Sequence, residues 1–185
     1  MTNIIDQNDK SLIEEKIDSR DIFDGKLLHV KSDRVMLPSG VEAVREWIKH
    51  PGAAAVVPRF ADGNVLLVRQ YRYPVHKVTL EIPAGKLDLE GEDPLNCAKR
   101  ELSEETGYEA AKWRKLTVIA TTVGFSDEYI HLYEATELTP GKQHPDDDEF
   151  INSVKVKLDD AIAMIYDGTI IDAKTIVALL MAAKG

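Results

Sequence analysis

Hydrophobic and polar residues alternate along much of the chain with the two-residue period of β-strands. After a polar N-terminal stretch, residues 11–50 predict a β-meander, with strands over 27–37 and 41–48 joined by a turn at Pro38-Ser39-Gly40. A meander of this size buries little apolar surface by itself. We therefore expect it to pack on the rest of the chain or on a second copy.

A different pattern begins at Gly52. The run 53–57 is continuously apolar, as in a strand buried on both faces. Further strands are expected over 64–73, 78–82, 116–121, 129–135 and 150–156. Helices are expected over 93–106, 158–167 and 172–184. Asp93 suits the N-cap of the first helix, Pro94 its first turn and Gly107 its C-cap. This order predicts an α/β fold with a mixed sheet and helices on both faces.

Composition fits a globular domain with an extension, because 44% of the 185 residues are hydrophobic and 30% are charged. A net charge of −9 argues against a nucleic-acid partner. Cys97 is the only cysteine, so no internal disulfide is expected, and its thiol should be buried. The sequence shows no signal peptide and no apolar run near the ~20 residues of a membrane span. We expect a cytoplasmic protein without a membrane partner.

The helix over 93–106 concentrates acidic side chains near its C-terminal end. Glu101 and Glu105 are four residues apart and share one side, Glu104 lies one step further round, and Arg100 is expected to point elsewhere. Such a group is usually a solvated acidic face. If it is partly buried, mutual repulsion, desolvation and the helix dipole all oppose it. A divalent cation such as Mg²⁺ or Mn²⁺ would offset all three costs.

The residues around these acids resemble the Nudix box. That box runs Gly, five residues, Glu, seven residues, then Arg-Glu-U-x-Glu-Glu-x-Gly-U, where U is apolar or aromatic. The matching residues are Gly85, Glu92, Arg100, Glu101, Leu102, Glu104, Glu105, Gly107 and Tyr108. One spacing differs, because six residues rather than five separate Gly85 from Glu92. The additional residue falls in the loop before the helix, where an insertion can be absorbed.

Residues from about 41 to 136 are similar to the ADP-ribose pyrophosphatase branch of this family. The matching segments are Arg45-Glu46-Trp47 with His50-Pro51-Gly52, Arg69–Pro74, Glu81–Gly85 and Gly124–Glu128. The resemblance implies a Nudix α/β/α sandwich, with residues 51–185 as the catalytic domain. Residues 1–50 would be an N-terminal sheet that forms a homodimer. Val123 stands where many members that prefer ADP-ribose have proline.

The same resemblance implies a metal site. Glu101 and Glu105 would be the principal ligands of Mg²⁺, with Mn²⁺ as a substitute, and Glu104 would be a shared or adjacent ligand with a part in catalysis. The Ala84 carbonyl would be a further ligand. Gly85 would allow backbone and phosphate to approach closely.

Substrate contacts are also implied. Arg45 and Glu46 would contact the adenine edge, Arg72 a phosphate or the terminal ribose, and Glu128 the substrate or its surroundings. Without the resemblance, the alternative for Arg72 is an ordinary surface arginine on a strand. The run 145–149 is acidic and by composition would be solvated. By resemblance it carries the catalytic base, Glu149 in the first place and Asp147 in the second.

The implied reaction is metal-dependent hydrolysis of ADP-ribose, or a related ADP-sugar, to AMP and a sugar 5-phosphate. Metal-bound water would lose its proton to a loop carboxylate and attack one phosphorus in line. GDP-mannose or another nucleoside diphosphate sugar is the alternative within the family. A non-catalytic nucleotide sensor on the same fold is a second alternative, and a plain acidic interaction domain a third. The presence of all three helix acids favours an enzyme.

Overall fold

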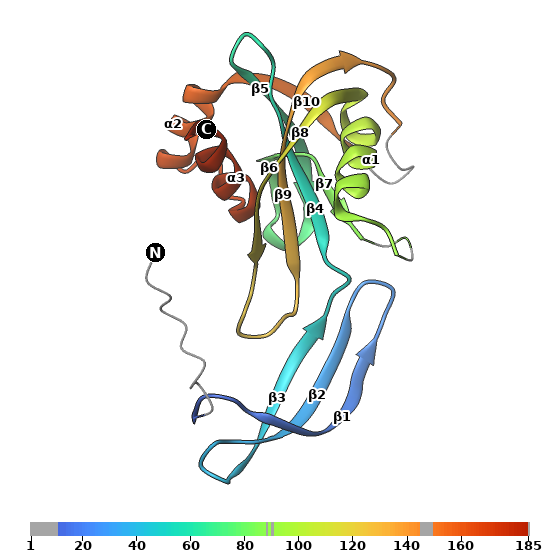
Figure 1. Cartoon of the computed structure of the whole chain (residues 1–185), viewed down its shortest axis with the longest axis vertical. Helices are drawn as coiled ribbons and strands as arrows, with labels where there is room; N and C mark the ends of the chain where they lie inside the picture. The colour runs from blue at the N-terminus through green and yellow to red at the C-terminus, as the bar shows by residue number, and fades with distance from the viewer. Residues whose placement is uncertain (1–10, 88, 90, 145–149, 185) are drawn as a thin grey trace. The chain divides into compact units, whose positions relative to one another are not determined.

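The computed structural model describes residues 11–87, 89, 91–144 and 150–184 of the chain. The chain forms two compact units. One unit is made of residues up to His50 together with Thr122–Glu128, and the other of Pro51–Thr121 together with the residues from Tyr129 onward. Figure 1 labels the elements of both.

The first unit is a three-stranded antiparallel sheet in the order β1-β2-β3. Its strands are β1 (Glu15–Asp24), β2 (His29–Met36) and β3 (Glu42–Lys49). The strands predicted over 27–37 and 41–48 are confirmed as β2 and β3. β1 was not predicted as a separate strand, because charged residues occur on both of its faces and blur the alternation. The Thr122–Glu128 segment joins the sheet where Ile48 N–H donates to the Phe125 carbonyl at 2.8 Å.

The second unit contains two sheets and three helices among its described residues. Its strands are β4 (Ala53–Pro58), β5 (Asn64–Arg72), β6 (Lys77–Glu81), β7 (Ala84–Lys86), β8 (Tyr108–Ala120), β9 (Tyr129–Pro140) and β10 (Asn152–Lys157). Its helices are α1 (Pro94–Thr106), α2 (Leu158–Tyr166) and α3 (Ala173–Ala183), and a 3₁₀ turn, η2, covers Tyr73–Val75. The sheet orders are β7-β4-β9-β8 and β10-β5-β6. The four-stranded sheet is mixed, because β4 runs parallel to β9 and antiparallel to β7.

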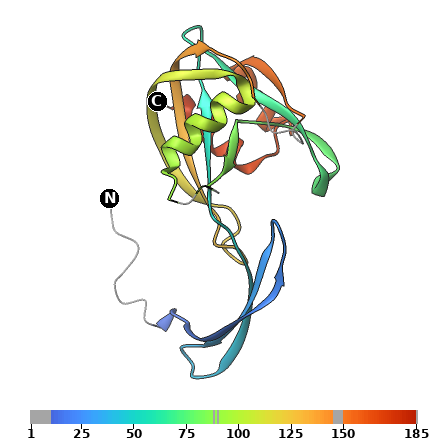
Figure 2. The same cartoon turned by 90° about the vertical axis from the view of Figure 1, so that its right-hand side faces the viewer.

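Alternation along β4 builds a core on each side of the four-stranded sheet. Ala53, Ala55 and Val57 pack in a cluster with residues of α2 and α3. Ala54 and Val56 pack in a second cluster with residues of α1. Figure 2 shows α1 lying across one face, with the other helices on the far side. The predicted mixed sheet with helices on both faces is confirmed, and all of β4 is buried as expected.

Local capping chemistry sets the ends of α1. The Asp93 carboxylate accepts hydrogen bonds from the backbone N–H groups of Leu95 (2.9 Å) and Asn96 (3.3 Å), and Pro94 opens the first turn. Gly107 ends the helix in the left-handed region, at φ 72°, where glycine is favoured. These three predicted positions are confirmed, so the register of the acidic residues on α1 is fixed.

In the second unit, two strand predictions were too short and one strand was missed. β8 and β9 extend well beyond the predicted 116–121 and 129–135. The three-residue β7 was not predicted, because its pairing partner, β4, is distant in sequence. No helix in the described part of the chain has the length and hydropathy that a membrane crossing requires.

Candidate functional site

The acidic side chains of α1 lie on a buried face. Glu101 retains 9% of its surface and Glu105 only 2%, whereas Glu104 is half-buried. They adjoin Ala98 and Leu102, which are fully buried against the four-stranded sheet. The interpretation as a solvated acidic face therefore does not hold for Glu101 and Glu105, and the electrostatic cost of their charges requires compensation.

The short strand β7 supports both buried carboxylates. A Cβ atom on Gly85 would overlap the Glu101 carboxylate, so only glycine allows this side chain to lie against the strand. One residue earlier, the backbone N–H of Ala84 donates to Glu105 Oε2 at 3.2 Å. Pairing of Ala84 and Gly85 with β4 holds this backbone in place. Helix and strand together therefore place Glu101 beside Gly85 and Glu105 beside Ala84.

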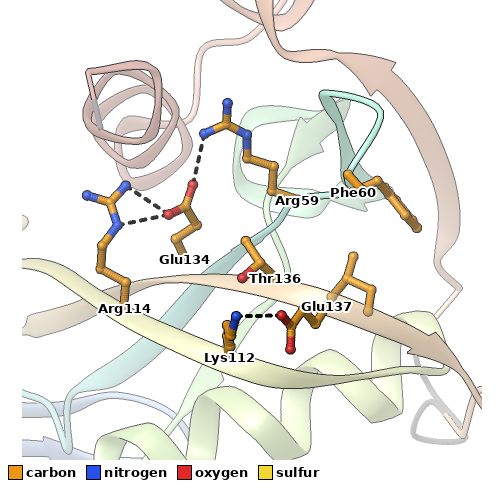
Figure 3. Close-up of a pocket in the computed structure, with 9 residues that line it drawn as sticks. Arg59, Phe60, Lys112, Arg114, Glu134, Thr136 and Glu137 are labelled. Atoms are coloured by element: carbon orange, nitrogen blue, oxygen red, sulfur yellow. Dashed lines mark hydrogen bonds and ion pairs between the residues drawn. The ribbon is translucent and has the colours of Figure 1, made fainter.

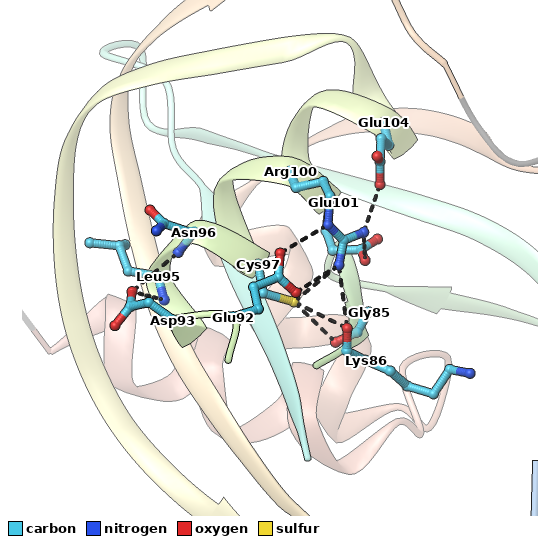
Figure 4. Close-up of polar contacts among 10 residues, drawn as sticks. All are labelled: Gly85, Lys86, Glu92, Asp93, Leu95, Asn96, Cys97, Arg100, Glu101 and Glu104. Carbon is cyan, nitrogen blue, oxygen red and sulfur yellow. Dashed lines mark hydrogen bonds and ion pairs between the residues drawn. The ribbon is translucent and has the colours of Figure 1, made fainter. Parts of the chain in front are cut away.

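Helical periodicity predicted that Arg100 would point away from the acids. In the structure its side chain contacts them instead. Its Nη1 donates to Glu101 Oε1 at 2.6 Å and to Glu104 Oε2 at 2.9 Å. Its Nε and Nη2 donate to Glu92 at 3.1 and 3.2 Å. Figure 4 shows the guanidinium lying among the three carboxylates. The side chain is long and flexible, so the direction of its Cα–Cβ bond does not fix where its charge lies.

One arginine is shared by three of the acids around it. Arg100 forms ion pairs with Glu92, Glu101 and Glu104. Burial, and after it the charges of Glu92 and Glu101, raise the pKa of the neighbouring Cys97 thiol to about 12. Cys97 is fully buried, as expected, and donates to the Lys86 carbonyl at 3.4 Å. Two of the carboxylates that share Arg100 thus also disfavour a negative charge on Cys97.

The donor chemistry at this point fits a hard divalent cation. Carboxylate and carbonyl oxygens are the ligands of Mg²⁺ and Mn²⁺. As the side chains lie, no three His, Cys, Asp or Glu groups within the described residues converge closely enough to hold a metal ion. Glu101 and Glu104 instead turn toward Arg100. A cation would thus compete with this guanidinium for two of its carboxylates.

Arg72, at the end of β5, is held by a buried carboxylate. Its Nε and Nη2 donate to the two oxygens of Glu81, each at 2.8 Å. Burial opposes ionisation of Glu81, but hydrogen bonds and charge from Arg72 and Lys174 outweigh it and hold the pKa of Glu81 at about 2. Glu81 raises the pKa of Arg72, and the charge of Glu105 adds to this effect. Arg72 is therefore an oriented cation within the field of the α1 acids.

Glu81 and Lys174 were not among the site residues predicted from the sequence. Glu81 carried a signal, since it is a charged residue that ends an apolar strand just before Pro83. Lys174 carried none, because its partner lies 93 residues away.

The predicted adenine-contacting residues belong to the first unit. Arg45 and Glu46 are consecutive on β3 and so lie on its opposite faces. Arg45 Nε donates to Glu14 Oε2 at 2.9 Å. Glu128 Oε1 lies 3.5 Å from His50 Nε2, and both side chains are largely buried. Asp147 and Glu149, the expected bases, lie outside the described residues.

A separate cavity of about 700 Å³ opens at β8 and β9 (Figure 3). Its arginines are already engaged, since buried Glu134 accepts from Arg59 Nη1 at 3.3 Å and from Arg114 Nε at 2.9 Å. At its rim Lys112 pairs with Glu137 at 2.6 Å. The cavity contains none of the residues predicted from the sequence, so it is not the candidate site.

Comparison with known proteins agrees with this geometry. The NUDIX domain model matches residues 49–179. The chain is 42% identical to an ADP-ribose pyrophosphatase of Bacillus subtilis, over 92% of each protein. It is 43% identical to a methanol dehydrogenase activator of Bacillus methanolicus, over 91% of this chain and 92% of that protein. A GDP-mannose pyrophosphatase of Yersinia enterocolitica is 35% identical, over 78% of this chain and 80% of that protein.

Among solved structures, an ADP compounds hydrolase matches with a TM-score of 0.83 over 94% of this chain and 95% of that one. At 23% identity this likeness concerns the fold. Nudix ADP-ribose pyrophosphatases generally use divalent metals, in keeping with the oxygen donors described above. The matched domain covers β4 to α3 and includes every residue of the carboxylate site on α1 and β7. The chain belongs to the Nudix family.

Proposed function

We propose that this chain hydrolyses the pyrophosphate bond of ADP-ribose, or of a related ADP-sugar, to AMP and a sugar 5-phosphate. The observation that carries the proposal is the pair of buried carboxylates, Glu101 and Glu105, held against β7, where Glu101 shares the cation Arg100 with Glu92 and Glu104. The relative from Bacillus subtilis, alike over almost the whole chain, supports the choice of substrate.

The metal ligands in this proposal are Glu101, Glu105 and Glu104 with the carbonyl of Ala84, and Mg²⁺ is the expected ion, with Mn²⁺ as a substitute. The bound cation would neutralise charge on the pyrophosphate and lower the pKa of a bound water. Glu101 and Glu104 would turn from Arg100 toward it. Arg100 would keep its hydrogen bonds to Glu92, which hold the guanidinium in place.

Arg72 would bind a phosphate oxygen. Since Glu81 accepts from Nε–H and from one N–H of Nη2, the N–H groups of Nη1 and the second N–H of Nη2 can donate to the substrate. The side chain is 42% exposed, so a ligand can reach it. A guanidinium fixed on two sides loses little conformational entropy when it binds an anion.

The remaining roles follow the family pattern. A loop carboxylate, Glu149 or else Asp147, would take the proton from the attacking water, with Glu104 assisting. Arg45, Glu46 and Glu128 would contact the substrate. Residues 1–50 would form an N-terminal extension that joins two copies into a homodimer, and residues 51–185 the catalytic domain. We expect the enzyme to act in the cytoplasm without a nucleic-acid or membrane partner.

The exposed apolar side chains of the first unit support the homodimer. Ile22 and Phe23 on β1 and Val44 on β3 retain 52%, 57% and 56% of their surface in the single chain. Contact with a second copy would remove this apolar area from water. Light scattering after gel filtration should give twice the chain mass of 20.6 kDa. A monomer at micromolar concentration would rule the homodimer out.

The decisive experiment is a substrate panel. ADP-ribose, GDP-mannose, diadenosine polyphosphates and NADH are each incubated with the protein and Mg²⁺ or EDTA, and products are resolved by phosphorus NMR. We expect AMP and ribose 5-phosphate from ADP-ribose with Mg²⁺ alone, and no turnover by Glu101→Gln. Faster cleavage of GDP-mannose would favour the second candidate, which the Yersinia relative supports. Calorimetric binding of ADP-ribose without cleavage would identify a sensor instead.

A further inference from the structure

The first turn of α3 is linked to the strand that carries the partner of Arg72. Lys174 Nζ lies 2.5 Å from Glu81 Oε2 and 3.1 Å from Asp172 Oδ2. The Lys174 side chain is 11% exposed and that of Glu81 3%. Two buried charges in contact, each with further partners, are held in a well-defined geometry. Lys174 is therefore a buried member of this network and not a surface lysine.

Glu81 is shared between two cations. One oxygen accepts from Arg72 Nε at 2.8 Å and from Thr79 Oγ1 at 2.6 Å, and the other accepts from Arg72 Nη2 and from Lys174. Each oxygen that accepts from Arg72 thus has a second donor, Thr79 for Oε1 and Lys174 for Oε2. Without Lys174, Glu81 Oε2 would lose one of its two cations, so the carboxylate, and the guanidinium bound to it, would be held less firmly in this orientation.

The same turn of α3 also holds Ile82, the residue that follows Glu81. Thr175 Oγ1 accepts a hydrogen bond from the Ile82 backbone N–H at 2.9 Å and donates to Asp172 Oδ2 at 2.5 Å. Thr175 and Ile82 are fully buried. Ile82 leads through Pro83 into β7, on which the α1 carboxylates lie. The N-terminal turn of α3 therefore supports both the arginine and the metal-binding strand of the proposed site.

We propose that Lys174 is a positioning residue for the pyrophosphatase reaction, acting through Glu81 to orient the Arg72 guanidinium toward the substrate phosphate. This inference rests on the proposed function, since it assigns Arg72 to a phosphate. It differs from a purely structural role, in which Lys174 would only anchor α3. A structural anchor affects stability whatever residue stands at position 72, whereas a positioning residue affects substrate binding only through Arg72.

The test is a double-mutant cycle. Lys174→Met, Lys174→Arg and the control Lys184→Met, at the exposed C-terminal cap of the same helix, are made in the wild-type and the Arg72→Ala backgrounds. KM and kcat for ADP-ribose and the thermal midpoint are measured for each. We expect Lys174→Met to raise KM about tenfold with kcat nearly unchanged, Lys174→Arg to restore most of the loss, and Lys184→Met to match wild type. In the Arg72→Ala background, Lys174→Met should leave KM unchanged.

Two results would overturn the inference. One is an equal KM effect of Lys174→Met with and without Arg72. The other is a fall in thermal midpoint without a change in KM. If wild type does not cleave ADP-ribose, the proposed function fails, and a substrate-independent readout then decides: the Arg72 Nε–H signal in ¹⁵N spectra. Lys174→Met should shift this signal and speed its exchange with solvent, and an unmoved signal would refute the coupling.

Discussion

Two groups of buried carboxylates in the second unit share their cations in opposite ways. Around Glu81, one carboxylate contacts two cations, Arg72 and Lys174, and Asp172 also pairs with Lys174. On α1, one cation, Arg100, is shared by three carboxylates, those of Glu92, Glu101 and Glu104. Both groups are hydrogen-bonded and both contain side chains that are almost fully buried.

This difference indicates two roles. The Glu81 group holds the site together, whereas we assign the α1 carboxylates to binding of a metal ion. A buried, fully paired acid contributes fixed geometry, and removing one partner leaves an uncompensated charge. Buried acids that share one cation repel one another, and a bound metal ion would offset this electrostatic cost. Substitutions in the two groups should therefore have opposite signatures, one in stability and the other in turnover.

The largest effect is expected from Glu105→Gln. This change removes a proposed metal ligand and its buried negative charge but keeps the shape of the side chain. Turnover of ADP-ribose should fall about 1000-fold, or about 4 kcal/mol. The thermal midpoint in EDTA should stay the same or rise, and its increase on adding Mg²⁺ should shrink. The exposed Glu109→Gln on β8 is the matched control. A lower midpoint with turnover retained would place Glu105 in the structural group.

Glu81→Gln should give the opposite signature. The pKa of Glu81 is about 2 in the folded chain against an ordinary 4.5, so ionised Glu81 stabilises the fold above pH 4.5, and this contribution is lost as the pH falls toward 2. Between pH 5 and pH 3 the loss is about 2 kcal/mol. Urea unfolding at each pH should show a shallower decline for Glu81→Gln than for wild type. Parallel declines in the two proteins would contradict the assignment.

Local chemistry made much of this arrangement predictable. The ends of α1 follow from Asp93, Pro94 and Gly107, whose effects act within one helix turn. The spacing of Glu101 and Glu105 then places both acids on one side. The sandwich followed in the same way from the apolar run at β4 and the amphipathic helices.

Contacts between distant segments were not predictable in this way. β7 is only three residues long and forms because β4 pairs with it. The direction of Arg100 depends on where Glu92 lies after the loop has folded, and a helical wheel does not contain that information. Lys174 meets Glu81 across 93 residues. The expected bases, Glu149 and Asp147, stay predictions because they fall outside the described residues.

The smallest effect in this comparison is expected at Gly85, where the backbone of β7 lies against the Glu101 carboxylate. In Gly85→Ala the new Cβ would overlap the Glu101 carboxylate, but that group is the end of a flexible side chain and can move aside. Stability in EDTA should therefore change little, while Mg²⁺ affinity should fall about tenfold, or about 1.4 kcal/mol. Titration calorimetry with Mg²⁺ measures this, with Gly124→Ala, where a Cβ meets nothing within 4 Å, as the control. Wild-type affinity in Gly85→Ala would mean that the position of Glu101 on β7 does not matter for the cation, and that the cation binds elsewhere.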